Sequence, residues 1–269
     1  MNFKITEKNW RIYKLRVLRK TILKLSGKVA LVTGGSRGIG FSTAKIFSEN
    51  GAQVVITAKD PKRLEKSVSK LSNAVGIPAD IKNEEDVRKV VQTIIEKFGK
   101  IDILVNNAGI FPKIKPLHEI EESEWKEVLD VNLTGQFRFT KAAIPHLKKT
   151  SGCIINISSD AGLKAYEGFN ADAYSAAKAA LINLTKCWAL EYSKNKIRVN
   201  CICPGVVDTD MTKPFMKTKK DRDFMDSEHP IGRIGQPDEV AKAILYFASD
   251  DASWTTGAVL AVDGGESIK

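Results

Sequence analysis

The sequence contains few histidines and few cysteines. Its three histidines are widely separated and lack the spacing of metal ligands, so no metal site is expected. The four cysteines lie in apolar segments, and Cys201-x-Cys203, which looks like half of a metal site, has no second pair. Buried, reduced thiols are therefore predicted, and with them a reducing compartment, taken as the cytoplasm. The residues concerned are His118, His146, His229, Cys153, Cys187, Cys201 and Cys203.

The chain also lacks an apolar run of membrane-spanning length, a low-complexity tract, an internal repeat and a Pro/Gly/Ser-rich linker. These absences argue against a transmembrane protein and against a division into separate domains. Hydrophobic residues make up 43% of the 269 residues, enough to bury a sizeable core. A single soluble, globular domain is expected.

Acidic residues are nearly absent from the start of the chain. Residues 1–28 hold nine lysines and arginines against Glu7 alone, so most of the net charge of +10 lies there. Apolar residues recur in this segment every three or four positions, which predicts a basic amphipathic extension over residues 1–25. Packing on the domain or on another subunit is its favoured role, with an anionic membrane, targeting and an unstructured tail as alternatives. The rest of the chain is nearly neutral, so no nucleic-acid partner is expected.

A glycine-rich turn follows the first apolar segment. Val29–Thr33 has the pattern of a buried strand, and Gly34-Gly35-Ser36-Arg37-Gly38-Ile39-Gly40 leads into a helical pattern that contains Ala44 and Phe47. In a strand-turn-helix unit, glycines let backbone amides and the helix N-terminus approach a pyrophosphate. The turn therefore predicts a dinucleotide site.

Tyr174 and Lys178 stand four residues apart in an alanine-rich, helix-forming stretch. At this spacing both side chains lie on one face of a helix, where an ammonium group favours the ionised form of a neighbouring phenol. A tyrosine whose pKa falls below its usual value of about 10 is a useful proton donor and acceptor. A half-buried aromatic beside a solvated charge is the alternative at this spacing, so the other motifs must decide.

With Thr33 before it, the Gly-x-x-x-Gly-x-Gly turn resembles the cofactor motif of the short-chain dehydrogenase/reductase family, and over residues 26–269 the chain is most similar to 3-oxoacyl thioester reductases. The resemblance implies an α/β, doubly wound Rossmann fold with a mainly parallel sheet and helices on both faces. The other matches are Asn106-Asn107-Ala108-Gly109, Ser158-Ser159 after the strand Cys153–Ile157, the Tyr174 and Lys178 pair, and Pro204-Gly205 after the strand Ile197–Ile202.

The resemblance implies four catalytic residues. Tyr174 exchanges a proton with the substrate oxygen, and Ser159 hydrogen-bonds that oxygen. Lys178 lowers the pKa of Tyr174 and binds the nicotinamide ribose. The backbone carbonyl of Asn132 holds a water that links Lys178 to solvent. The loop between Ser159 and Tyr174 is longer than the common form, which leaves Ser158 as the alternative to Ser159.

Cofactor preference follows from the end of the second predicted strand, Gln53–Thr57. An acidic residue there would bind the ribose of NAD, but Ala58 and Lys59 follow instead. Arg37 and Lys59 are expected to hold the 2′-phosphate of NADP. NAD remains the alternative because Asp60 comes next, although Asp60 is also the expected N-cap of a helix opened by Pro61.

Other cofactor contacts are implied by the resemblance: Asp80 is expected at the adenine ring, and Val207 and Thr209 at the nicotinamide carboxamide and a phosphate. The expected cofactor set is Thr33, Gly34, Ser36, Arg37, Gly38, Ile39, Gly40, Lys59, Asp80, Ile81, Asn107, Ala108, Gly109, Tyr174, Lys178, Pro204, Gly205, Val207 and Thr209. Further predicted elements are a strand at Ile77–Asp80, helices at Asn83–Phe98 and Pro237–Ala248, a helix capped by Ser123, another beginning near Asn132, and a last strand at Gly257–Val262.

The expected reaction is reversible hydride transfer between a nicotinamide and a carbonyl or secondary alcohol, most similar to an NADP-dependent 3-oxoacyl thioester reductase. A sugar or polyol dehydrogenase, another ketone reductase and a catalytically silent nucleotide-binding scaffold are the alternatives. The charged segment Thr209–His229 resembles the family's lid over the substrate, and the helix Asp172–Ser193 is expected in the contacts of a homotetramer or homodimer. Basic residues expected near an acidic carrier protein are Lys148, Lys149, Lys194 and Lys196.

Overall fold

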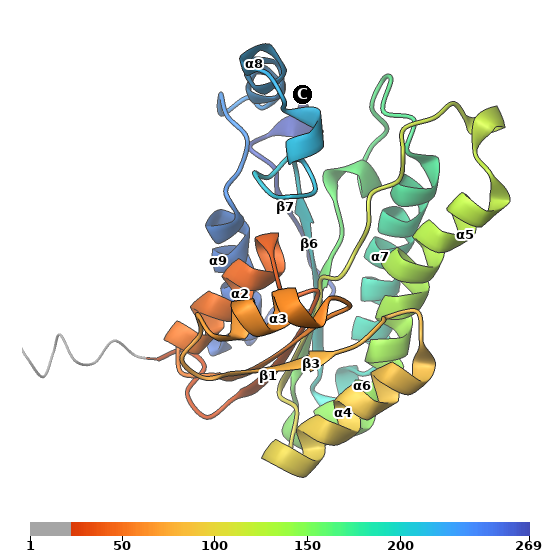
Figure 1. Cartoon of the computed structure of the whole chain (residues 1–269). Helices are drawn as coiled ribbons and strands as arrows, with labels where there is room; N and C mark the ends of the chain where they lie inside the picture. Colours follow the sequence, from red (N-terminus) through yellow and green to blue (C-terminus); the bar gives the residue numbers. More distant parts are fainter. Residues whose placement is uncertain (1–22) are drawn as a thin grey trace, which may run out of the picture.

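The computed structural model describes residues 23–269, which form a seven-stranded, wholly parallel sheet with helices on both faces (Figure 1). The strand order is β3-β2-β1-β4-β5-β6-β7, so the chain winds outward in both directions from β1 and β4. The predicted doubly wound α/β fold is therefore confirmed. The strands are β1 (Val29–Thr33), β2 (Gln53–Ala58), β3 (Ala74–Pro78), β4 (Ile103–Asn106), β5 (Cys153–Ile157), β6 (Arg198–Pro204) and β7 (Val259–Val262).

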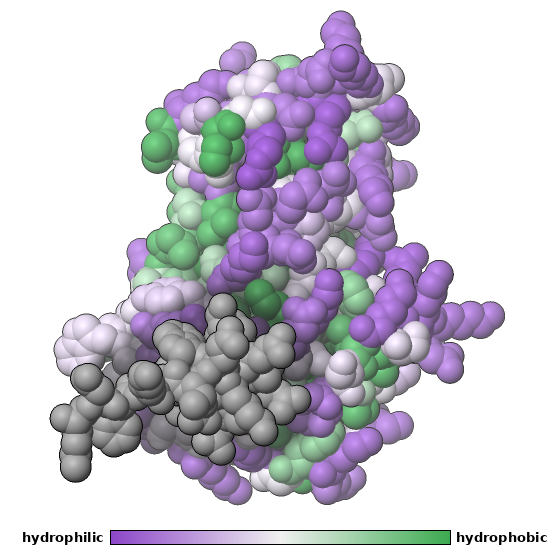
Figure 2. All heavy atoms as spheres, turned by 90° about the vertical axis from the view of Figure 1, so that its left-hand side faces the viewer, coloured by the Kyte–Doolittle hydropathy of each residue, from purple (hydrophilic) through white to green (hydrophobic). Residues whose placement is uncertain are grey.

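Two layers of helices bury the sheet. One layer packs α2 (Gly38–Glu49), α3 (Pro61–Val68) and α9 (Pro237–Ala248) on one face, and the other packs α4 (Glu84–Phe98), α6 (Gly135–Thr150) and α7 (Asp172–Glu191) on the opposite face. Two further helices, α5 (Glu122–Leu129) and α8 (Lys219–Glu228), stand beyond the carboxyl ends of the strands (Figure 1). The left-hand side of that view, with α2, α9 and α8, is covered mainly by hydrophilic side chains, among which hydrophobic ones form smaller patches (Figure 2).

Each central strand contributes side chains to both hydrophobic cores because its side chains alternate between the two faces of the sheet. In β1, Ala30 and Val32 pack under α2 and α9, whereas Val29 and Leu31 pack under α4 and α6. All five residues of β1 are buried. Burial on both faces explains why the strands of this sheet are continuous apolar runs rather than alternating patterns.

Buried asparagines connect the central strands to the helices above them. Asn106 at the end of β4 donates from Nδ2 to Asn156 Oδ1 in β5 at 2.8 Å and to Thr140 Oγ1 in α6 at 2.9 Å. Asn156 in turn donates to Thr185 Oγ1 in α7 at 2.9 Å. These hydrogen bonds hold β4 and β5 to each other and to α6 and α7.

Several predicted element boundaries shift. The strand expected at Ile77–Asp80 is found at Ala74–Pro78, because its register is set by pairing with β2. The helix expected to be capped by Ser123 is capped by Glu121, which forms a reciprocal pair of hydrogen bonds with Glu124. The prediction that Ser123 is the cap was therefore wrong. Asp60 does cap α3, its carboxylate accepting from the backbone N–H of Arg63 at 3.1 Å.

Most of the predicted amphipathic extension lies outside the described residues. Its last part is described, and Leu25 is only 1% exposed and belongs to the core beneath α2 and α9. Lys24 pairs with Asp251 just after α9. Among the described residues, no helix is both long and apolar enough to cross a bilayer.

The cysteines depart from prediction at one position. Cys153, Cys201 and Cys203 are buried thiols, and the Sγ atoms of Cys201 and Cys203 lie 4.0 Å apart on one face of β6. Cys187 is exposed because it lies on the outer face of α7. The prediction that all four thiols are buried was therefore wrong for Cys187.

Candidate active site

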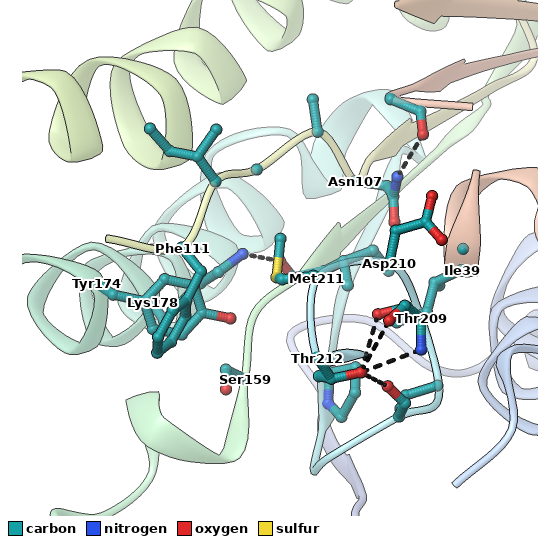
Figure 3. Close-up of a pocket in the computed structure, with 18 of the residues that line it drawn as sticks. Ile39, Asn107, Phe111, Ser159, Tyr174, Lys178, Thr209, Asp210, Met211 and Thr212 are labelled. Atoms are coloured by element: carbon teal, nitrogen blue, oxygen red, sulfur yellow. Dashed lines mark hydrogen bonds between the residues drawn. The ribbon is translucent and has the colours of Figure 1, made fainter. Parts of the chain in front are cut away.

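A cavity of about 970 Å³ opens at the carboxyl ends of the strands, where ligand sites form in open parallel sheets. Its walls come from the turns after β1, β4, β5 and β6 and from the segment that carries α8. Ser159, Tyr174 and Lys178 lie on one side of the cavity, and the loop of Thr209–Thr212 lies across from them (Figure 3). The fold thus brings together residues that are far apart in the sequence.

The glycine turn after β1 packs so closely that side chains are excluded. A Cβ at Gly40 would lie 2.4 Å from the Gly34 carbonyl oxygen, and one at Gly34 would lie 2.8 Å from the Ala108 Cα. Gly34 and Gly38 also adopt positive φ angles of 64° and 53°. This cradle of backbone, opening on the N-terminus of α2, fits a pyrophosphate group.

Asn107 and Thr33 connect the turns after β1 and β4. Asn107 Nδ2 donates to the Thr33 carbonyl oxygen at 2.8 Å, and the backbone N–H of Asn107 donates to Thr33 Oγ1 at 2.9 Å. The N–H of Ala108 donates to the same hydroxyl at 3.0 Å. The two motifs therefore form one rigid wall of the cavity. At the far side, Thr209 reaches the glycine turn, since a Cβ at Gly38 would lie 3.2 Å from Thr209 Cγ2.

The outer end of the cavity carries several charges. Lys59 Nζ lies 2.9 Å from Asp80 Oδ2, and this hydrogen bond raises the pKa of Lys59. Arg37 lies 3.6 Å from Asp210, a looser pair. Asp60 is engaged in capping α3. Lys59 and Asp80, expected at different parts of the cofactor, are thus partners of each other in this structure.

Asn132 is completely buried in a π-helical turn, η2 (Asp130–Thr134), which joins α5 to α6. Its Oδ1 accepts from the N–H of Ile110 at 2.8 Å, and its Nδ2 donates to the Ile110 carbonyl at 2.9 Å. Both hydrogen bonds hold the loop that follows Gly109. Single π turns within helices are frequent at functional sites because they change the direction of side chains and free a carbonyl group. The helix expected to begin near Asn132 is therefore a continuation of an earlier one.

Tyr174 and Lys178 both lie on the inner face of α7, as their spacing predicted. Lys178 Nζ is 5.5 Å from the centre of the Tyr174 ring and donates to the Ile157 carbonyl at 2.8 Å. Burial raises the pKa of Tyr174 to about 12, and the neighbouring Ser159 hydroxyl opposes this rise. Burial lowers the pKa of Lys178 to about 8. In this structure burial, rather than the neighbouring ammonium, dominates the pKa of the phenol.

The two serines after β5 point in different directions. Ser158 donates from Oγ to the carbonyl of Lys178 at 2.7 Å and so fastens β5 to α7. Ser159 is the residue whose hydroxyl contacts Tyr174, and it donates to Asp160 Oδ1 at 2.8 Å. The geometry therefore favours Ser159 over Ser158 as the hydroxyl that meets a substrate beside Tyr174.

An aromatic wall covers Tyr174, and none of its other members was predicted as a site residue from the catalytic motifs. The Phe111 ring centre lies 5.0 Å from that of Tyr174, 5.6 Å from that of Phe169 and 5.4 Å from that of Phe215. Phe215 comes from the segment expected to act as a lid. Phe169 belongs to the long loop before Tyr174.

A cluster of buried polar residues next to Ser159 was not predicted either. Its members are Asp160, Tyr166, His229 and Glu266, of which Asp160, His229 and Glu266 are 7%, 2% and 9% exposed. His229 is buried because the turn after α8 folds its ring against Glu266, with His229 Nε2 2.9 Å from Glu266 Oε2. An acidic residue directly after Ser159 was the available signal in the sequence.

A backbone cradle closed to side chains, facing a buried phenol, ammonium and hydroxyl at the edge of a parallel sheet, defines a dinucleotide-dependent oxidoreductase. The chain belongs to the short-chain dehydrogenase/reductase family. Residues 34–267 match a model of this family described as Enoyl-(Acyl carrier protein) reductase. The enzyme acts on carbonyl or CH–OH groups.

Two names recur among the relatives. The 3-oxoacyl-[acyl-carrier-protein] reductase FabG of Thermotoga maritima is 38% identical over 251 residues, covering 90% of this chain and 99% of that protein. The L-fucose dehydrogenase of Oryctolagus cuniculus is 40% identical over 249 residues, covering 91% of this chain and 87% of that protein. Among solved structures, gox2181 superposes with a TM-score of 0.89 at 33% identity, covering 92% of this chain and 98% of the other.

Proposed function

We propose that the protein is an NADP(H)-dependent reductase of 3-oxoacyl thioesters. The observation that carries this proposal is the meeting of Ser159, Tyr174 and Lys178 under an apolar, aromatic wall beside the glycine cradle. Transfer of an acyl chain from water to such an apolar wall lowers the free energy of the complex. Several relatives of similar length and 38–42% identity are named 3-oxoacyl-[acyl-carrier-protein] reductases.

In the proposed reaction the bound nicotinamide supplies the hydride. Tyr174 gives its proton to the oxygen on which negative charge develops, and its high pKa keeps that proton in place until the charge appears. Ser159 donates a hydrogen bond to the same oxygen. Lys178 binds the cofactor ribose and, when charged, stabilises the phenolate that Tyr174 becomes. The backbone carbonyl of Asn132 holds a water that returns a proton through Lys178.

The preference for NADP is supported by the charges at the outer end of the cavity. Of the described acidic residues near the end of β2, Asp60 already caps α3 and Asp80 is already paired with Lys59. Lys59 and Arg37 are both exposed at this end, where they could bind a 2′-phosphate. A phosphate would compete with the two carboxylates for these cations.

A sugar or polyol dehydrogenase is the second candidate. It is favoured by the relatives named L-fucose dehydrogenase and by the buried acidic group beside Ser159, whose oxygens suit hydroxyl groups. A third candidate, a silent nucleotide-binding scaffold, is disfavoured because Ser159, Tyr174 and Lys178 are brought together at one cavity.

Docking of an acidic carrier protein on the predicted lysines meets a geometric obstacle. Lys148 and Lys149 end α6 just before β5 begins, and Lys194 and Lys196 lie just before β6 begins. The starts of parallel strands lie at the edge opposite to Ser159. A carrier bound there would serve the cavity of another subunit, which fits the homotetramer or homodimer that we propose for this protein in the cytoplasm.

The test is a steady-state screen of 3-oxoacyl thioesters, sugars, polyols and simple ketones with both cofactors, using the Tyr174→Phe variant as the control for background. We expect the highest kcat/KM with a 3-oxoacyl thioester and NADPH. A higher value with a sugar would favour the second candidate. Binding of NADPH without turnover of any compound would overturn the proposal of an enzyme.

A further inference from the structure

The hydroxyl hydrogen of Ser159 is donated to a neighbouring carboxyl group. Ser159 Oγ lies 2.8 Å from Asp160 Oδ1, and both residues are buried at the cavity wall. The Ser159 oxygen itself accepts from the backbone N–H of Ala161 at 3.2 Å. A serine hydroxyl has a single hydrogen. Ser159 therefore cannot donate to Asp160 and to a substrate carbonyl at the same time.

Asp160 is held firmly in this position. The backbone N–H of Ala161 donates to Oδ1 at 2.8 Å, and the Tyr166 hydroxyl donates to Oδ2 at 2.8 Å. Tyr166 comes from the long loop that precedes Tyr174. The same carboxyl thus contacts the predicted catalytic serine on one side and the unusual loop on the other.

A second carboxyl group faces Asp160 from the C-terminal turn of the chain. Glu266 lies against Gly205, where a Cβ would be 3.0 Å from Glu266 Oε2, and that oxygen is also 2.9 Å from His229 Nε2. His229 Nδ1 donates to the Met225 carbonyl of α8 at 2.7 Å. The ionisable groups around Asp160 are Glu266, His229, Asp263, Tyr166, Tyr174 and Cys203.

We propose that Asp160 is a positioning residue for Ser159. The protonation state of the Asp160 carboxyl group decides whether the Ser159 hydroxyl is available to the substrate oxygen. An ionised Asp160 accepts the hydrogen bond that Ser159 donates, so the serine hydroxyl is engaged. A protonated Asp160 is a much weaker acceptor and can itself donate to Ser159 Oγ, so the serine hydrogen turns to the carbonyl of the substrate. Glu266 and Tyr166 set the balance, because a negative charge favours protonation of Asp160 and a hydroxyl donor opposes it.

The electrostatics of the cluster agree with this geometry. Burial, and then the charge of Glu266, raise the pKa of Asp160 to about 6, while the donors Ser159 and Tyr166 oppose the rise. Burial disfavours the charged form of His229, but the contacts with Glu266 and with the Met225 carbonyl outweigh it and raise the pKa of His229. The titration of Asp160 therefore falls in the range where an enzyme of this kind is assayed.

The test is the pH dependence of single-turnover carbonyl reduction, followed with saturating cofactor. We expect a rate that is high at low pH and falls about tenfold or more as Asp160 ionises. Two variants should move this fall in opposite directions, each by about one pH unit. Glu266→Gln removes a negative charge and shifts it to lower pH, whereas Tyr166→Phe removes a donor to the carboxylate and shifts it to higher pH.

Matched variants separate positioning from a structural role. Glu228→Gln makes the same change in another acidic residue of the cavity wall and should leave the pH-dependent fall in rate unchanged. Asp160→Asn cannot ionise and should abolish it. The proposal is overturned if the wild type shows no fall, if Asp160→Asn retains it, or if Glu266→Gln and Tyr166→Phe shift it in the same direction.

The inference rests on carbonyl reduction beside Ser159 and not on the acyl group of the proposed substrate. The rates are therefore measured with any carbonyl compound that the enzyme reduces, so a failure of 3-oxoacyl thioesters leaves this test intact. The backbone amide of Ala161, which donates to both Ser159 and Asp160, gives a second readout by NMR without turnover. Its chemical shift should titrate in the wild type and not in Asp160→Asn, and a flat shift in the wild type would contradict the proposal.

Discussion

Burial shifts the pKa values of Tyr174 and Lys178 in opposite directions, toward the neutral form of each side chain. The pKa of the Tyr174 phenol is about 12, and the pKa of the Lys178 ammonium is about 8. The spacing of the two residues correctly placed them on one helix face. It did not reveal that Lys178 donates to the Ile157 carbonyl, because that contact depends on how α7 packs on β5.

Replacement of Tyr174 by phenylalanine removes the proposed proton donor and keeps the aromatic contact with Phe111. Turnover should fall by about two to four orders of magnitude, while the affinity for NADPH stays within a few-fold of the wild type. Stopped-flow reduction and fluorescence titration of the cofactor measure the two quantities. Near-normal turnover would remove Tyr174 from the mechanism.

The free energy of unfolding is expected to depend on pH because the Lys178 ammonium is buried. Its pKa is about 8 in the folded chain against 10.5 for the unperturbed side chain, so burial of the ammonium destabilises the fold below pH 8. This cost is relieved as the pH rises from 8 to 10.5. Lys178→Met has no charge to bury, so its advantage over the wild type should shrink across this window by up to about 3 kcal/mol. Urea unfolding without cofactor at several pH values measures it, and a constant difference would contradict the pKa.

Lys59→Ala should weaken the binding of NADPH by about tenfold and the binding of NADH much less, since NADH has no 2′-phosphate. The same change also releases Asp80 from its partner. Lys62→Ala, in the first turn of α3, is the matched loss of a nearby lysine. Equal effects of Lys59→Ala on both cofactors would argue against the proposed preference for NADP.

At the level of elements, the sequence predicted what depends on neighbouring residues and missed what depends on distant ones. The bounds of β1 and α9 agree with the predicted Val29–Thr33 and Pro237–Ala248, because apolar periodicity and end signals define them locally. The third strand was misplaced because its register depends on β2. The contact of His229 with Glu266 joins the turn after α8 to the last residues of the chain, and no local pattern encodes it.

The N-terminus of α3 provides a test that separates capping from cofactor selection. Asp60→Ala removes the hydrogen bond to the N–H of Arg63 and should cost about 1 kcal/mol of unfolding free energy. Asp60→Ser supplies another capping oxygen and should restore most of it. Because Asp60 is engaged as a cap, neither variant should change the ratio of NADPH to NADH affinity. A large change in this ratio in both variants would instead assign Asp60 to the ribose.

In the whole molecule, Leu25 connects the start of the described chain to the helical layer that contains α2 and α9. Its side chain is 1% exposed and lies in the same core as Phe47 of α2 and Ala252 after α9. Leu25→Ala should lower the free energy of unfolding by about 2–5 kcal/mol. Leu23→Ala, which changes a side chain that is 44% exposed, is the control. An equal effect of the two substitutions on urea denaturation would show that Leu25 does not support this core.

The position of β1 in the middle of the sheet has a consequence for synthesis of the protein on the ribosome. β1 emerges before both of its partners, because it pairs with β2 on one side and with β4, which begins at Ile103, on the other. Until β4 has left the exit tunnel, β1 keeps an open edge and apolar faces. Pulse proteolysis of ribosome-bound chains of increasing length should show protection of β1 only once β4 has emerged, and earlier protection would contradict this order. The nascent chain therefore passes through a stage in which β1 can pair with another chain, so that protection by a chaperone would matter most before β4 emerges.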